Sequence, residues 1–495
     1  MSLDAQPPAA GPAEAGTAAA AAAGPQGGAD EWVARQAGRR EYLPSWLGEA
    51  QRGAERIGWW PRLAVAGLAG ALLPLVGLGG FQLQVGIDAL VIALLAVGLN
   101  IVVGWAGLLD LGYVAFFGFG AYGFALLSSN QLGPNGIHLP AYASVPAVMV
   151  GAAVFGLLVG LPSRRLIGDY LAIVTLFLGE AFVEFTNNVD PKTFGGPNGI
   201  VGIDAIRGFG HQLSTNTGYY YLLVIVLVAT MAVLRLLETS RTGRAWRAVR
   251  EDPLAAAAMT IPVNRVKLMA FAFGAMVAAL AGTIFAAQQI SVFPTDFDTP
   301  ILILVYAGLI LGGAGSIAGA ATGALVVMVI YDGLLRSPAD SGIVFYGLIV
   351  LTLLVKLRPW RRLAGVVAAT VALGFAAHAV VKAISASAVA GGPGSTGWIG
   401  SALRDWVIVP ANPTVPGNWG FVVLICLLIA LVQVQGRWRT ILLVPVIYLA
   451  SFVWETRLVT QPAITRQLMI GAILIVMMNS RPQGLLGTRR VETPT

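Results

Sequence analysis

The sequence predicts an all-α membrane protein, a polytopic bundle of about twelve transmembrane helices of roughly 20 residues each. Hydrophobic residues make up 57% of the 495-residue chain and charged residues only 11%, whereas soluble domains carry about 25% charged residues. The mean hydropathy is +0.76. The 61 glycines suit helices that approach one another closely in lipid.

The basic clusters lie at the ends of apolar segments and indicate a topology. Arginine-rich loops stay on the cytoplasmic side of a membrane. All the clusters face the cytoplasm if segment 299–333 crosses as two short helices, because an even number of crossings then separates each pair. We therefore predict two helices in 299–333 and a cytoplasmic N-terminus. The clusters are Arg164/Arg165, Arg241–Arg250, Arg358–Arg362, Arg437/Arg439 and Arg481–Arg490.

The N-terminal region has two parts that precede the apolar segments. Residues 1–30 are rich in Ala, Pro and Gly with almost no aromatic or branched residues, a composition that predicts disorder. Residues 31–62 combine six arginines with four tryptophans. This combination predicts a cytoplasmic segment that lies at the membrane interface.

The segment Thr239–Lys267 is the longest polar interruption with its own helical order. Asp252 followed by Pro253 is typical of a helix start, and Pro262 ends the apolar run that begins at Leu254. A positive-inside anchor would explain the arginines of this segment but not a capped apolar helix. A helix of about two turns does not hold together alone in water, so we expect it to dock into a partner.

Polar groups inside the apolar segments are the other functional candidates, because they are costly in lipid. Asn100 and Asp110 flank a glycine-rich break at 104–112, which has a loose echo at 308–319. The alternatives are a lining of the transport pathway and a structural role. The remaining acids of this kind are Asp88, Glu180, Glu184 and Asp332, of which Glu180 and Glu184 share one helix face.

The loop Thr193–Ile200 is a run of turn residues on the outer side. An ordinary turn and an external gate or docking surface are both consistent with it.

Motifs of enzymes and metal sites are missing from the sequence. It contains no GxxxxGK[ST] phosphate loop, no HExxH and no GxSxG, and its three histidines lack ligand spacing. We therefore expect no catalytic residues, no metal and no cofactor. The net charge of +7 does not predict nucleic-acid binding, because the arginines lie at segment ends where they set orientation.

Several ordered motifs together resemble the LivM-type permease subunits of ABC importers for branched-chain amino acids, a group that includes urea and short-chain amide permeases. The motifs span most of 60–335 and recur near the C-terminus. They are Gly98–Asn100, Val103–Gly107, Leu111–Gly118, Gly120–Tyr122, Tyr170–Leu176, Gly195–Gly199, Ser240–Ala245, Arg250–Asp252, Ala257–Met259 and Arg481–Gly487.

The resemblance implies that 239–267 is a coupling loop whose short helix docks into a separate ATPase subunit, so that this chain hydrolyses no ATP itself. It also implies a homologous LivH-type permease, a periplasmic or lipid-anchored substrate-binding protein, and a bacterial plasma (inner) membrane. The expected coupling residues are Arg244, Arg247, Arg250, Glu251, Asp252, Pro253, Ala255, Ala256 and Met259. The expected pathway residues are Asn100, Asp110, Tyr113, Phe116 and Glu180, and those of the external loop are Gly195, Gly196 and Asn198.

The chain departs from the family pattern in two places. Thr260 stands where the coupling loop of the family usually has glycine. Residues 336–463 do not match, so the expected division is a core at 63–335, an additional transmembrane insertion of unknown role, and a last segment with its tail at 464–495. A urea or amide permease, an ion-coupled secondary transporter acting alone, and a membrane scaffold without transport activity stay open as alternatives.

Overall fold

The structure is a computed structural model that describes residues 58–77, 79–132, 136–163, 169–208, 211–213, 215–336, 338–356, 360–395, 397–434, 436–459, 461–480 and 484–486. The tail predicted at 1–30, almost all of the interfacial segment predicted at 31–62, the cluster Arg164/Arg165, and all arginines of the cluster Arg481–Arg490 lie outside these ranges. The chain divides into two units, Met1–Ala66 and Gly67–Thr495. Of the first unit, the structure describes only the beginning of helix α4 (Trp59–Leu72).

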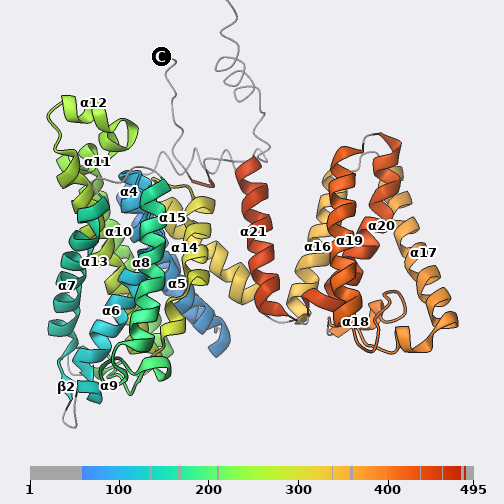
Figure 1. Cartoon of the computed structure of the whole chain (residues 1–495), viewed down its shortest axis with the longest axis horizontal. Coiled ribbons are helices and arrows are strands. Elements are labelled where there is room, and N and C mark those ends of the chain that lie inside the picture. The colour runs from blue at the N-terminus through green and yellow to red at the C-terminus, as the bar shows by residue number, and fades with distance from the viewer. Residues whose placement is uncertain are drawn as a thin grey trace, which may run out of the picture. The chain divides into compact units, whose positions relative to one another are not determined.

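The described part of the second unit is built almost entirely of helices (Figure 1). The first half contains η1 (Leu73–Val76), α5 (Gly80–Leu99), η2 (Asn100–Trp105), α6 (Tyr113–Leu127), η3 (Asn130–Leu132), α7 (Ala141–Ser163), α8 (Asp169–Asn188), α9 (Pro191–Phe194), η4 (Gly196–Asn198), α10 (Asn216–Thr239), α11 (Arg241–Glu251), α12 (Pro253–Ala258) and α13 (Val263–Gln289). The second half contains η5 (Pro294–Phe297), α14 (Thr299–Gly312), α15 (Ile317–Met328), η6 (Val329–Leu334), α16 (Pro338–Lys356), α17 (Trp360–Ile384), η7 (Ala386–Val389), α18 (Gly397–Leu403), α19 (Thr414–Gln433), α20 (Arg437–Val453), η8 (Trp454–Leu458) and α21 (Pro462–Ser480). Of these, η2, η6 and η8 are π-helical.

Extended structure in the described residues is limited to three antiparallel pairs of two-residue strands. They are β1 (Ser128–Ser129) with β2 (Ile137–His138), β3 (Ile200–Val201) with β6 (Ser291–Val292), and β4 (Arg207–Gly208) with β5 (His211–Gln212).

The length and composition of the helices confirm the prediction of an all-α polytopic membrane protein. Ten helices of the described ranges are long and apolar enough to cross a membrane, and three shorter apolar helices accompany them. The segment 299–333 forms two helices, α14 and α15, as the distribution of basic clusters predicted.

Helix α13 lies at the centre of the core and packs against α5, α6 and α7. Its contact with α6 is backbone to backbone: a Cβ added to Gly120 would overlap the backbone of Ala279, and one added to Gly282 would overlap the carbonyl of Phe117. In lipid, where hydrophobicity does not drive helices together, such close approach supplies van der Waals contact. This explains part of the chain's high glycine content.

The last helix, α21, packs against α14 and α15. Ile470 lies in one apolar cluster with Leu304, Ala307, Leu311 and Val327. One helical turn before Ile470, Arg466 of α21 pairs with Asp332 of η6 at 2.7 Å. The intramembrane acid Asp332 therefore has a structural partner.

The helices of the insertion expected at 336–463 have an apolar core of their own, in which α19 packs on α20. Glu455 in η8 is buried and accepts three hydrogen bonds, from the hydroxyl of Tyr346 (2.9 Å), the N–H of Ser395 (2.8 Å) and the hydroxyl of Ser395 (2.8 Å). This carboxylate therefore joins η8 to α16 and to the loop before α18.

Glu455→Gln is expected to lower the free energy of unfolding by about 2 kcal/mol. Hydrogen bonds to a charged group contribute about 1.5–3 kcal/mol, and the replacement turns one accepting oxygen into an NH2 group that faces hydrogen-bond donors. The matched control is Asp405→Asn, at an exposed acid of the same region, which should change stability by less than about 0.5 kcal/mol. Unfolding of the detergent-solubilised chain, followed by tryptophan fluorescence, measures both. Equal stability of the two variants would contradict the role of Glu455.

Candidate functional site

The polar segment between α10 and α13 folds into two short helices at one end of the core (Figure 1). Ser240 caps α11 by accepting from the N–H of Gly243 at 3.3 Å. Asp252 caps α12 by accepting from the N–H groups of Leu254 (2.7 Å) and Ala255 (3.1 Å), and Pro253 occupies the first helical position. The helix start predicted at Asp252–Pro253 is confirmed. Both caps satisfy N–H groups that a helix cannot bond internally.

Helix α12 presents an apolar surface to the outside of the chain. Leu254 is 83% exposed and Met259 is 75% exposed. Glu251, Asp252, Pro253 and Ala255 are exposed as well, whereas Ala256 is 4% exposed and faces the protein. Of the expected coupling residues on this helix, all but Ala256 are therefore accessible to a partner.

The arginines of α11 point in different directions. Arg244 donates to the carbonyl of Thr239 (2.8 Å), and Arg247 donates to the carbonyl of Glu238 (3.3 Å). Both side chains thus complement the C-terminal end of α10, where carbonyl groups lack helical partners. They remain exposed. Arg250 instead turns inward and donates to the carbonyl of Gly104 in η2.

The inward face of α11 is held by a tryptophan pair. Gly243, Trp246 and Val249 are buried at three-residue spacing on this basic helix. Trp246 is fully buried, donates its indole N–H to the carbonyl of Val266 (2.8 Å), and stacks on Trp105 with ring centroids 5.9 Å apart. Trp105 belongs to η2, so the pair links α11 to a π-helical break that follows α5.

The two glycine-rich breaks of the sequence meet each other in space. The N–H of Gly315 donates to the side-chain oxygen of Asn100 (2.7 Å), and the carbonyl of Gly315 accepts from the indole of Trp105 (3.2 Å). The approach is close, since a Cβ on Gly104 would lie 2.7 Å from the N–H nitrogen of Gly315. Both polar groups of the Gly315 residue are therefore satisfied by η2.

The family-like C-terminal motif reaches the same place. The N–H groups of Leu485 and Leu486 donate to the carbonyls of Leu311 (2.8 Å) and Gly312 (2.9 Å). These carbonyls end α14 and lack helical partners. The loop 313–316 is thus contacted by η2 and flanked by the C-terminal motif.

The expected pathway residues are mostly packed inside the core. Asn100, Asp110, Tyr113 and Phe116 are at most 1% exposed. The hydroxyl of Tyr113 donates to the carbonyl of Gly274 (3.1 Å). Phe116 contacts the rings of Tyr113 and Phe155.

Asp110 and Glu180 differ from the rest of this group. One carboxylate oxygen of Asp110 accepts from the N–H of Gly112 (3.0 Å), while the other is buried without a hydrogen-bond partner among the described residues. Glu180 is exposed and accepts from the hydroxyl of Thr299. The structure does not bring Glu180 together with the buried four, and a pathway role for all five stays a prediction.

The turn predicted to form an external loop lies at the end of the core opposite α12. Helix α13 leads from α12 to β6, and its 27 residues span about 40 Å at 1.5 Å per residue. Strand β6 pairs with β3, which directly follows the turn of Gly195, Gly196 and Asn198. Gly195 and Gly196 have φ values of 77° and 58°, which favour glycine.

Asp190 opens this turn by capping α9. Its carboxylate accepts from the hydroxyl of Thr193 (2.6 Å) and from the N–H of Lys192 (3.1 Å). These bonds hold the pKa of Asp190 below its ordinary value, with the Thr193 hydroxyl as the main cause. The turn is therefore an ordered structure, and its gate or docking role stays a prediction.

These features define a multi-pass helical membrane protein that exposes a capped apolar helix at one end. The family described as the permease component of branched-chain amino acid transport systems matches residues 81–354, more than half of the chain. The chain belongs to this family. The match runs through most of α16, which lies beyond the end of the core expected from the sequence.

Individual relatives agree with the family. The chain is 36% identical to the high-affinity branched-chain amino acid transport system permease protein LivM of Salmonella typhimurium and 35% identical to that of Escherichia coli, each over 292 residues. These alignments cover 54% of this chain and 66% of each relative, so the chain spans just under two thirds of their length. The permease protein LivH of Escherichia coli is 27% identical over 282 residues, which cover 53% of this chain and 88% of that protein. No solved structure matches the chain.

Sequence reasoning missed Trp105, Trp246 and Gly315 as members of the site. The signal for Trp246 was available, because Gly243, Trp246 and Val249 form an apolar stripe on an otherwise basic helix. Gly315 carried no such signal, since its partners are more than 200 positions away.

Thr260 adopts a left-handed conformation with φ of 65°, which disfavours a β-branched residue by about 1–2 kcal/mol. Thr260→Gly is expected to stabilise the loop by up to about 1 kcal/mol, because relief of strain exceeds the added chain entropy. Hydrogen exchange of residues 252–262 measures this effect.

The matched control is Thr322→Gly, the same replacement at an exposed position inside α15. It should destabilise its helix by about 0.5–1 kcal/mol. If both replacements destabilised alike, the conformation of Thr260 would not be strained.

Proposed function

We propose that this chain is a transmembrane permease subunit of an ATP-driven importer for branched-chain amino acids. The chain itself carries out no chemistry. It is coupled through α12 to a separate ATPase subunit that hydrolyses ATP. The observation that carries the proposal is the capped apolar surface of α12, which the chain itself leaves exposed.

The chemistry of α12 suits a docking helix. Leu254 and Met259 provide large apolar anchors, and such residues contribute most to binding when a partner desolvates them. The caps at Ser240 and Asp252 hold the two short helices in shape before binding, which reduces the entropy lost on association.

The charge distribution supports a cytoplasmic position for α12. Arginines and lysines gather at this end of the core, whereas the described residues of the opposite end, in the loops 189–208 and 290–298, contain only Lys192 and Arg207. The basic residues near α12 are Arg235, Arg241, Arg244, Arg247, Arg250, Arg265 and Lys267. The positive-inside rule then assigns this end to the cytoplasm, and the turn at 195–199 to the exterior, where a periplasmic or lipid-anchored binding protein would deliver substrate.

The route from α12 into the membrane runs through two contacts of α11. Trp246 stacks on Trp105, and Arg250 donates to the carbonyl of Gly104. Both contacts end in η2, a π-helical break, and π-helical turns are frequent at functional sites. A displacement of α12 would therefore move the junction of η2 and the loop 313–316.

The partners and the substrate are proposed from the relatives. The LivM and LivH relatives are both named as permeases of branched-chain amino acid transport systems. We propose that this chain pairs with a second, homologous permease of the LivH type, two ATPase subunits and a substrate-binding protein in a bacterial plasma membrane, with its N-terminus in the cytoplasm.

Replacing Leu254 and Met259 together by Asp is expected to abolish capture of the ATPase subunit. Loss of two buried anchors at about 2 kcal/mol each lowers affinity by at least about a hundredfold. Affinity purification of the detergent-solubilised chain, with the captured ATPase identified by mass spectrometry and by its activity, measures the effect. Leu132→Asp, at a leucine that is 45% exposed at the opposite end, is the control. Undiminished capture by the double variant would exclude α12 as the docking helix.

Arg250→Ala is expected to separate ATP hydrolysis from transport. The variant retains the surface of α12 and so still binds the ATPase, but it loses the hydrogen bond to Gly104 and should transport at least about tenfold less leucine per ATP, a change worth about 1.4 kcal/mol. Proteoliposomes that contain the assembled importer report both rates. Arg247→Ala removes an arginine of the same helix that bonds only toward α10 in the contacts above, and should leave the ratio unchanged. A normal ratio in both variants would refute the proposed route.

A further inference from the structure

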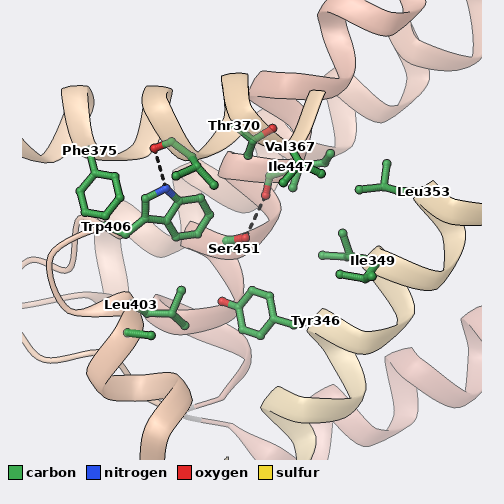
Figure 2. A pocket seen from close by; sticks show the side chains of 13 residues that line it. Tyr346, Ile349, Leu353, Val367, Thr370, Phe375, Leu403, Trp406, Ile447 and Ser451 are labelled. Carbon is green, nitrogen blue, oxygen red and sulfur yellow. Dashed lines mark hydrogen bonds between the residues drawn. The ribbon is translucent and has the colours of Figure 1, made fainter. Parts of the chain in front are cut away.

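Helix α16, most of which lies in the family match, and the helices that follow it enclose an apolar pocket that the proposed function does not use. The pocket has a volume of about 330 Å³. Figure 2 shows the side chains that line it, which come from α16, α17, α18 and α20 together with Trp406. Apart from four polar side chains, its wall consists of aliphatic and aromatic groups.

The polar side chains of the wall are all bonded within the protein. Thr370 donates to the carbonyl of Val366 (2.8 Å) and Ser451 to that of Ile447 (3.0 Å), each one helical turn back. A polar ligand would have to exchange bonds of this kind, whereas a hydrocarbon would leave them in place.

The two larger polar side chains are bonded in the same way. Trp406 donates to the carbonyl of Val371 (3.1 Å), and Tyr346 donates to the carboxylate of Glu455 (2.9 Å). The indole of Trp406 packs directly on Gly374, where an added Cβ would overlap it. The wall therefore favours an apolar occupant.

The depth of the pocket excludes a lipid headgroup. Candidate span Trp360–Ile384 has its midpoint at residue 372, and the pocket residues of α17 run from Val367 to Phe375. Candidate span Trp438–Leu458 has its midpoint at residue 448, next to Ile447. Both helices independently place the pocket at the middle of the hydrocarbon core, where a bilayer about 30 Å thick contains only acyl chains.

The pocket opens to the outer surface of the helices that line it. Val350, Val367, Val371 and Phe375 line the pocket and are each between 44% and 53% exposed. The surroundings of exposed residues at this depth of a membrane protein are lipid. We propose that the pocket is a lipid-binding site that holds the end of one phospholipid acyl chain at the bilayer midplane.

Photolabelling of the full-length chain tests this site. The chain is reconstituted in nanodiscs of phosphatidylethanolamine and phosphatidylglycerol with a trace of phospholipid that carries a diazirine at the end of one acyl chain. We expect the label on pocket peptides of α16, α17 and α20 to exceed, several-fold, the label on Val422, which is 50% exposed at the middle of candidate span Thr414–Leu431 and lies outside the pocket. A diazirine placed next to the headgroup should not show this excess.

Two blocking variants and one matched control make the result specific. Val371→Trp and, on the opposite wall, Val350→Trp fill the mouth and should reduce pocket labelling several-fold. Val422→Trp, the same replacement at the same depth on α19 outside the pocket, should not. Size-exclusion chromatography shows which variants remain folded, and either blocking variant suffices.

Three outcomes would overturn the proposal. One is pocket labelling no higher than labelling at Val422, and another is equal labelling with the two diazirine positions. The third is labelling of the isolated chain that disappears in the assembled importer, which would show that a helix of a partner subunit occupies the pocket.

Discussion

The hydrogen bonds at Gly315 join η2 to the loop between α14 and α15 at the end of the core that carries α11 and α12. A break in a membrane helix exposes N–H and carbonyl groups that neither lipid nor a regular helix can satisfy. Here the break at η2 and the loop between α14 and α15 satisfy each other, since Asn100 accepts from Gly315 and Trp105 donates to it. At the end of α14, the carbonyls of Leu311 and Gly312 accept from the N–H groups of Leu485 and Leu486. The other contacts of this end, including those of α11, are built on this junction.

The same junction explains why polar residues in the apolar segments are weak indicators of a pathway. Asn100 is a pathway candidate because polar side chains are costly in lipid, and Tyr113 is one because of the family resemblance. In the structure, their partners are backbone groups of Gly315 and Gly274, so both have a structural reason to be buried, and their pathway role stays a prediction. Asp110 is the exception, because one of its carboxylate oxygens lacks a partner among the described residues. In a glycine-rich helical protein, repair of the backbone competes with function as the reason for a buried polar group.

The sequence predicted elements better than orientations. The cap at Asp252, the helix after it and the division of 299–333 follow from local chemistry, which capping residues and charge clusters record. The rotation of a helix about its own axis depends on distant contacts instead. Arg250 lies on a basic stretch and Ala256 on an apolar stretch, and the sequence predicts that both are accessible to a partner. In the structure, Arg250 donates a hydrogen bond to the carbonyl of Gly104, and Ala256 is buried against the protein. No local pattern distinguishes Arg250 from Arg247, because the acceptor at Gly104 is 146 positions away.

The additional helices are compatible with the core because they preserve the side on which the chain ends. Five apolar helices follow η6 within the described ranges, where the family resemblance requires one, at 464–480. One crossing and five crossings both bring the C-terminal motif to the end opposite η6. At that end Leu485 and Leu486 meet the carbonyls of α14, next to the loop that contacts η2. An odd number of extra helices would place this motif on the wrong side and leave those carbonyls unpaired. The requirement to satisfy backbone groups at the junction therefore limits which insertions this fold accepts.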